Sequence, residues 1–77
     1  MIQSVHEIDP VVLMMETLER QICEKTGGSI HDLRVEFLDE QIVLSGRTSR
    51  YYNKQLATKA VRELLHEDQL SNRIEVI

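Results

Sequence analysis

Histidine and cysteine, the residues that most often do chemistry in proteins, are few in this sequence and widely spaced. His6, His31 and His66 lie outside any H-x-x-x-H or H-E-x-x-H pattern that would place two imidazoles on one helix face. Cys23 is the single cysteine, so it gives neither an internal disulfide nor a zinc framework. It falls on the flank of an apolar helical stripe, where a thiol acts as a small hydrophobe. The sequence therefore predicts no metal, no cofactor and no catalytic residue.

Gly27-Gly28-Ser29 is the segment whose composition comes nearest to a phosphate-binding loop. Loops of that kind connect a strand to the helix that follows it. This segment instead comes directly after a predicted helix, and glycine just past a helix end is typical of a C-cap. We interpret it as a helix stop and predict no nucleotide site there.

A basic region provides the candidate site. Residues 41–62 carry five bases and no acid, although the whole chain has a net charge of −4. Several of these bases precede or begin the second predicted helix, where positive charge opposes the helix dipole and free backbone N–H groups favour anions. Two tyrosines add amphipathic rings of the kind found at interfaces. We predict an anion-binding or partner-binding surface made of Arg47, Arg50, Tyr51, Tyr52 and Lys54.

Two alternatives accompany this prediction. A run of charges on a helix is also typical of an ordinary solvated face, which would bind nothing. A second candidate contact patch consists of Val12, Leu13 and Met14, near the first turn of the first helix. The composition disfavours nucleic acid as a partner, because the chain has thirteen acids and neither a GXXG motif nor an aromatic RNP-type motif.

Two predicted helices must position these residues. Asp9-Pro10 is an N-cap followed by proline at the first helical position. Apolar residues then recur every three or four positions, which predicts a helix over about 10–26. Thr48-Ser49 offers a hydroxyl cap for a second helix over about 49–66, whose buried face is Leu56, Ala57, Ala60, Val61 and Leu64.

Three strands complete the expected elements. Alternating apolar and polar residues predict strands over about 32–38 and 41–46, joined by a turn at Asp39-Glu40. A third strand is expected over 70–77, where Ile74 and Val76 alternate with charged residues. The order of elements along the chain is helix, strand, strand, helix, strand.

This order predicts one α+β domain over residues 1–77, a two-layer αββαβ fold with both helices on one face of a three-stranded mixed sheet. We expect the second strand at the centre, because a right-handed crossover through the second helix places the third strand parallel beside it. Charged and polar residues would cover the other, solvated face. The expected core is Leu18, Ile22, Val35, Phe37, Ile42, Leu44, Leu56, Ala60, Leu64 and Ile74.

Residues 32–76 carry an ordered set of features: Val35 and Phe37, the strand Ile42-Val43-Leu44-Ser45-Gly46, the helix with Ala57, Ala60 and Val61, and the closing Leu70, Asn72, Ile74 and Val76. In these features the segment resembles the BON domain, a module named for bacterial osmotic-stress and nodulation proteins. The chain departs from the family at Glu40 or Gln41, where glycine is frequent, and at Asp68-Gln69, where a Gly-Val pair is frequent. The resemblance implies a divergent member of the family.

The resemblance also implies a non-enzymatic binding module of a class associated with bacterial envelopes and phospholipid membranes. The N-terminus shows neither a basic region nor an apolar core of a secretory signal, and no stretch reaches the roughly 20 apolar residues of a bilayer span. We therefore expect a cytoplasmic protein without a transmembrane segment. Its expected function is protein–protein interaction or self-association, and the alternative is binding to anionic phospholipid.

Overall fold

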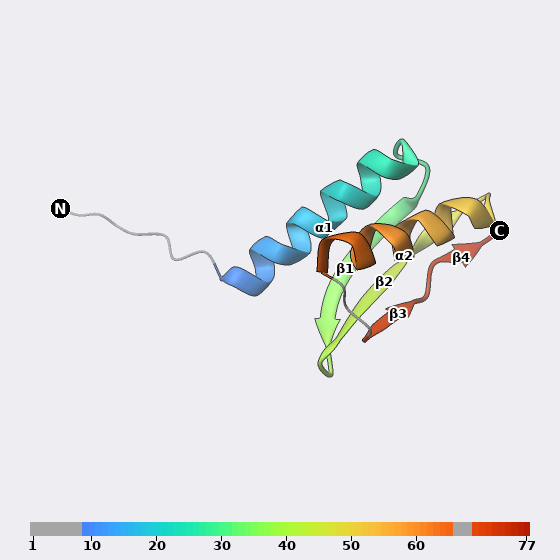
Figure 1. Cartoon of the computed structure of the whole chain (residues 1–77). Coiled ribbons are helices and arrows are strands. Elements are labelled where there is room, and N and C mark those ends of the chain that lie inside the picture. The colour runs from blue at the N-terminus through green and yellow to red at the C-terminus, as the bar shows by residue number, and fades with distance from the viewer. Residues whose placement is uncertain (1–8, 66–68) are drawn as a thin grey trace.

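Two helices and a small sheet account for residues 9–65 and 69–77, the part of the chain that the computed structural model describes (Figure 1). Both helices lie against the same face of the sheet, so the predicted α+β class is confirmed. The elements are α1 (Pro10–Thr26), β1 (His31–Leu38), β2 (Gln41–Thr48), α2 (Tyr51–Leu65), β3 (Leu70–Asn72) and β4 (Glu75–Val76).

Helix α1 begins and ends where local sequence signals place its caps. The Asp9 carboxylate accepts a hydrogen bond from the backbone N–H of Val11 at 2.9 Å, with Pro10 at the first helical position. At the other end Gly27 adopts a left-handed conformation, with φ of 62°. Its N–H and that of Gly28 bond back to the last carbonyls of the helix. The Gly27-Gly28 segment is thus a C-cap, as the sequence indicates.

Strand β2 is the centre of the sheet. It pairs antiparallel with β1 on one side and parallel with β3 and β4 on the other. The parallel pairing requires the crossover through α2 that the order of elements predicts. Strand β1 therefore forms one edge of the sheet, and β3 with β4 forms the other.

The third strand differs from the single run expected over 70–77. It is split into β3 and β4 because the Asn72 side chain accepts a hydrogen bond from the backbone N–H of Ile74 at 3.1 Å. A side chain that bonds the nearby backbone in this way competes with the ladder. The Asn72 amide also donates to the Lys54 carbonyl at 2.9 Å and to the Thr58 hydroxyl at 2.8 Å. Asn72 thus ties this edge of the sheet to α2.

The core contains most of the residues expected from periodicity, with three errors. Leu56 is half-buried and lies outside both the buried cluster and the side chains that pack against it. Phe37 and Leu64 are 47% and 42% exposed. Phe37 lies near the hairpin end of the edge strand, where little of the helical layer covers it. In α2 the buried stripe continues from Val61 to the partly buried Leu65, four residues on, and leaves Leu64 outside. Ile30, which precedes β1, is an unexpected member of the core.

The turn between β1 and β2 places two non-glycine residues in left-handed conformations, Asp39 with φ of 51° and Glu40 with φ of 61°. Both central residues of a type I′ hairpin turn need positive φ, which asparagine and glycine adopt most easily. Replacing Glu40 with glycine should therefore raise the free energy of unfolding, by about 1 kcal/mol. Chemical denaturation measures this change.

Gln41→Gly is the matched control, because Gln41 is exposed like Glu40 but lies in β2. Glycine inside a strand should lower stability by roughly 0.5–1 kcal/mol. A Glu40→Gly variant that is no more stable than the parent would contradict the turn conformation.

Candidate functional site

The start of α2 is organised around a buried hydroxyl. Thr48, the last residue of β2, is fully buried, and its Oγ1 accepts hydrogen bonds from the Asn53 amide at 3.0 Å and the Arg50 backbone N–H at 3.4 Å. The helix begins at Tyr51, two residues later than the expected start at 49, and its expected last residue, His66, lies outside the described residues. The Thr48 hydroxyl is therefore used inside the fold, at the start of α2.

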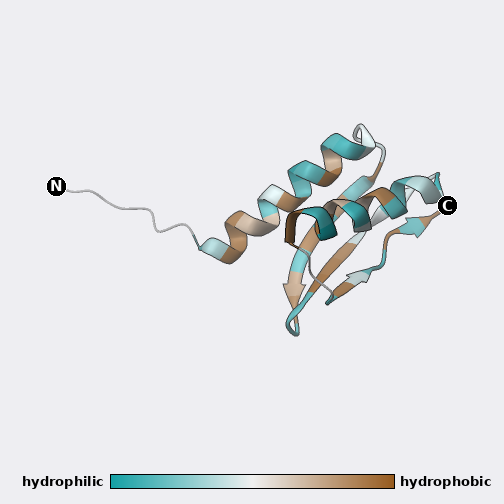
Figure 2. Ribbon diagram, viewed as in Figure 1, coloured by the Kyte–Doolittle hydropathy of each residue, from teal (hydrophilic) through white to brown (hydrophobic). Residues whose placement is uncertain are grey.

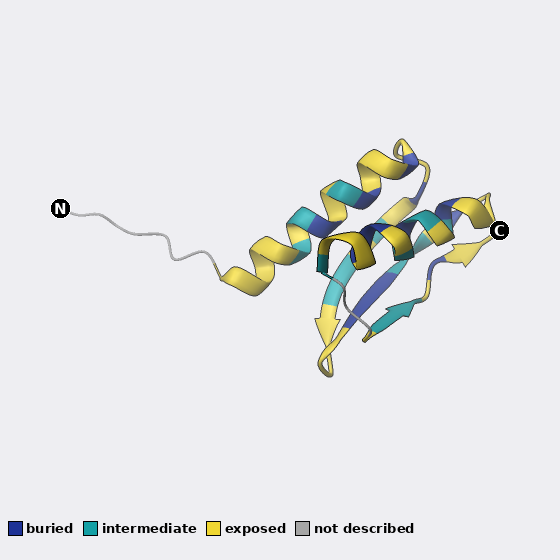
Figure 3. Ribbon diagram, viewed as in Figure 1, coloured by how far each residue is buried: buried dark blue, intermediate teal, exposed yellow. Residues whose placement is uncertain are grey.

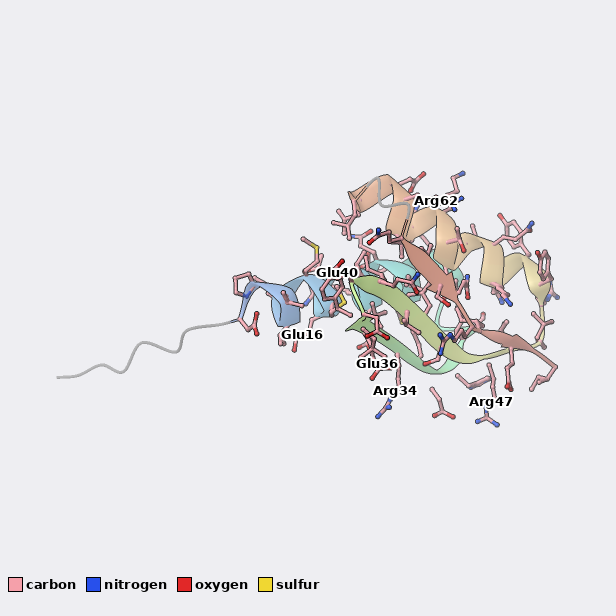
Figure 4. The ribbon with its side chains drawn as sticks, turned by 90° about the horizontal axis from the view of Figure 1, so that it is seen from below. Glu16, Arg34, Glu36, Glu40, Arg47 and Arg62 are labelled. Carbon is pink, nitrogen blue, oxygen red and sulfur yellow. The ribbon has the colours of Figure 1, made fainter. Side chains whose placement is uncertain are left out.

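Arg47 lies on the opposite side of the sheet from α2. Neighbouring residues of a strand point to opposite faces, and Thr48 contacts α2, so Arg47 points to the open face. There it forms an ion pair of 2.6 Å with Asp32, with both side chains largely exposed. Figure 4 shows Arg47 on one side of the molecule and Arg62, from α2, on the other. The structure thus separates Arg47 from the bases of α2.

Tyr51 and Lys54, two other predicted site residues, lie together in a groove of about 650 Å³ beside the outer face of α2. The groove also contains Lys59 and Arg62, which sequence reasoning left out of the site. Arg50 and Tyr52 are exposed but do not line the groove. We name Tyr51, Lys54, Lys59 and Arg62 the α2 groove.

The spacing of the α2 groove bases was available in the sequence. Lys54, Lys59 and Arg62 follow one another at intervals of five and three, which brings them to one side of a helix. Between residues 9–65 and 69–77 none of the three forms an ion pair. The floor of the groove offers little else to a ligand, because the Asn72 amide already bonds Lys54 and Thr58. The arrangement can attract anions by charge alone.

A second surface is apolar and lies around the start of α1 and the hairpin end of β1. Its members are between 37% and 50% exposed although all are apolar: Val11, Val12, Met14, Phe37 and Leu38. Figure 2 shows the apolar start of α1, and Figure 3 shows that the same turns are exposed. We name these five residues the α1–β1 surface. It shares Val12 and Met14 with the contact patch expected from the sequence. It adds Phe37, which was expected in the core, and Leu38, for which there was no expectation from the sequence.

Two grooves cross the α1–β1 surface. One, of about 260 Å³, is lined by apolar residues of α1, β1, β2 and α2. The other, of about 420 Å³, lies between α1 and the edge strand β1 and also includes Glu16, Glu19 and Glu36. Among residues 9–65 and 69–77, no base lines either groove. The α1–β1 surface is therefore apolar with an acidic rim, whereas most charged residues of the α2 groove are basic.

Potential metal ligands are scattered over the described part of the chain. No group of three histidine, cysteine or carboxylate side chains lies close enough to hold a metal ion within residues 9–65 and 69–77. Cys23 and His31 are exposed, and His6 and His66 lie outside the described residues. In the same part of the chain, neither helix has both the length and the apolar composition needed to cross a bilayer.

Comparison of the chain with protein-family models, with curated proteins and with solved structures finds no match. The resemblance to the BON domain therefore stays a prediction that depends on the residues named above.

Proposed function

We propose that this chain is a non-enzymatic protein-interaction module that binds through the α1–β1 surface. The observation that carries the proposal is the exposure of five apolar residues of α1 and β1 that line two grooves sharing Val11 and Phe37. Isolated exposed apolar residues are ordinary, but contiguous ones with polar neighbours are typical of protein-binding sites. Aromatic, methionine and aliphatic side chains of this kind dominate the energy of interfaces when they become buried.

The acidic rim distinguishes a protein partner from an anionic membrane. Glu16, Glu19 and Glu36 border the apolar side chains, and a surface rich in phosphatidylserine would repel them. The α2 groove has the charge that an anionic lipid requires, but among the described residues that line it Tyr51 is the single apolar side chain, and Glu63 lies beside its bases. Protein interaction is therefore the function that these surfaces support best, and anionic-lipid binding through the α2 groove is the second candidate.

A Val12→Ser, Phe37→Ser double variant tests the proposal. The immobilised chain is incubated with lysate of its source cells, cross-linked, and its bound proteins are quantified by mass spectrometry against bare resin. The double variant should recover at least about tenfold less of the proteins that the parent enriches, because central apolar contacts carry most of an interface's energy. Both replaced residues are about half exposed, 50% and 47%, so the fold should persist.

Leu13→Ser is the matched control. Leu13 is 49% exposed on the same helix, but it lines neither groove. It should recover the same proteins as the parent. Equal recovery by the double variant and the parent would refute the α1–β1 surface as the binding site.

Vesicles with and without phosphatidylserine serve as the second ligand in co-sedimentation. The parent should stay in the supernatant with both. Sedimentation with acidic vesicles that is lost at high salt and in a Lys54→Gln, Lys59→Gln, Arg62→Gln variant would favour the second candidate instead.

A further inference from the structure

Strand β1 presents a free edge. It pairs with β2 on one side, and within residues 9–65 and 69–77 no strand pairs with its other side. An unpaired edge is a template for a further strand. A register shift between His31 and Arg34 interrupts the start of β1, so the regular part of the edge is 34–38.

The outward-facing backbone groups follow from the hairpin. The turn at Asp39-Glu40 has two residues, so the flanking Leu38 and Gln41 face each other as a hydrogen-bonded pair. Bonded and non-bonded pairs alternate along an antiparallel ladder. The backbone N–H and C=O groups of 35 and 37 therefore point away from β2, toward the free edge.

Two opposite charges stand on the open face of this edge. Arg34 and Glu36 are two residues apart (Figure 4). Val35 lies between them and packs against the core on the helix side. Their neighbours in β2 are uncharged, since Arg34 lies opposite Ser45 and Glu36 opposite Val43. Within the described part of the chain neither forms an ion pair.

This pattern is complementary to itself. In an antiparallel pair of β1 strands with the two-fold axis at Val35, Arg34 lies opposite Glu36 of the second copy, and Glu36 lies opposite Arg34 of the second copy. The same register places Val35 opposite its own equivalent. The Val35 pair is then a hydrogen-bonded one, which agrees with the direction of the free backbone groups.

We propose that the occupant of the α1–β1 surface is a second copy of this chain, which joins β1 to β1 as an antiparallel, two-fold symmetric dimer. The inference rests on the proposed function and names the partner. It accounts for the half-buried Leu33 and Val35 and the exposed Phe37, which lie on the helix face of β1. Cross-strand aromatic, β-branched and opposite-charge pairs stabilise such a joint. A closed, two-fold arrangement also covers the free edge in both copies.

Sedimentation equilibrium of the purified full chain tests the proposal through charge reversal. The parent should be a dimer at micromolar concentrations. Arg34→Glu places four carboxylates and no base at the two cross-strand positions, and Glu36→Arg places four bases there. Each single variant should raise the dimer dissociation constant by about tenfold or more, because opposite-charge pairs become like-charge pairs.

Two combinations should restore the dimer. The Arg34→Glu, Glu36→Arg double variant recovers both opposite-charge pairs within one sequence. An equimolar mixture of the two single variants should form a heterodimer, because every cross-strand position then joins a carboxylate to a base. Denaturation of each variant alone checks the fold, and since both residues lie on the open face their monomer stability should match the parent's.

A Glu16→Gln, Glu19→Gln variant separates a second copy from a foreign basic segment. These carboxylates line the groove beside the edge, so a second copy brings a like-charged set to it. The variant should dimerise about as well as the parent or several-fold better, whereas it should hold a basic partner less well.

A parent chain that is monomeric at several hundred micromolar would overturn the dimer, as would single variants that dimerise like the parent. Neither result would bear on lysate capture by the α1–β1 surface, which tests the proposed function separately. Restored association in the mixture, together with its loss in each single variant, would establish the β1 pairing.

Discussion

Replacing Gly46 with valine should lower the free energy of unfolding by roughly 2–5 kcal/mol, through backbone strain and a close contact together. Gly46 has φ of 147°, a conformation that side chains with a Cβ rarely adopt. A Cβ at this position would lie 2.9 Å from the Ile30 side chain, 3.0 Å from the His31 carbonyl oxygen and 3.2 Å from the Leu33 Cα. Two of these three contacts are with backbone, which cannot rotate away. Urea denaturation monitored by circular dichroism measures the loss.

Gly28→Ala separates strain from contact. Gly28 also has positive φ, 74°, but a Cβ there meets nothing within 4 Å. The Gly28→Ala variant should lose only about 1 kcal/mol of unfolding free energy, because it adds backbone strain without a close contact. A Gly46→Val variant that unfolds like Gly28→Ala would show that β1 moves aside easily. A variant as stable as the parent that failed to bind partner would make Gly46 a contact residue and would contradict the structural role.

The elements of this fold were predictable because their signals are local. Asp9-Pro10 and Gly27 mark both ends of α1, and the alternation of Leu33, Val35 and Phe37 indicates β1. The split between β3 and β4 was not predictable in the same way. It depends on Asn72 reaching both its own backbone and α2, and the partners in α2 are 14 and 18 residues away in sequence.

The candidate surfaces were harder to predict because exposure depends on which elements meet. Phe37 has the alternation of a core residue, and only its place near the hairpin end of the edge strand leaves it exposed. Arg47 and Lys54 are close in sequence, yet the strand–helix junction at Thr48 sends them to opposite sides of the sheet. Charge counted along the chain therefore found a basic region but could not say which bases share a surface.

The rim of the α1–β1 surface is acidic, whereas most of the charged residues of the α2 groove are basic. Glu16, Glu19 and Glu36 border the α1–β1 surface, while Lys54, Lys59 and Arg62 line the α2 groove. The ion pair of Lys25 with Glu63, at 3.0 Å, joins α1 to α2, and Glu63 lines the α2 groove beside its bases. This separation means that a variant in one surface should leave binding at the other intact, so the lysate and vesicle experiments report on different residues.

Leu44→Ala should lower the free energy of unfolding by about 2–5 kcal/mol, the range for a large-to-small change in a packed core. Leu44 lies in the central strand, is fully buried, and packs in the cluster that joins both helices to the sheet. Its strand pairs with every other strand, so little can collapse into the space that the missing atoms leave.

The control for this change is Leu13→Ala, which removes the same atoms from a side chain that is 49% exposed in α1. It should alter stability by less than about 0.5 kcal/mol, because alanine suits a helix and no cavity forms. Both variants are denatured at protein concentrations below the dissociation constant of any dimer, so that association does not contribute to the measured stability. A loss at Leu44 no larger than that at Leu13 would show that the two layers do not share one packed core. The α1–β1 surface would then lack the rigid support that both binding proposals require.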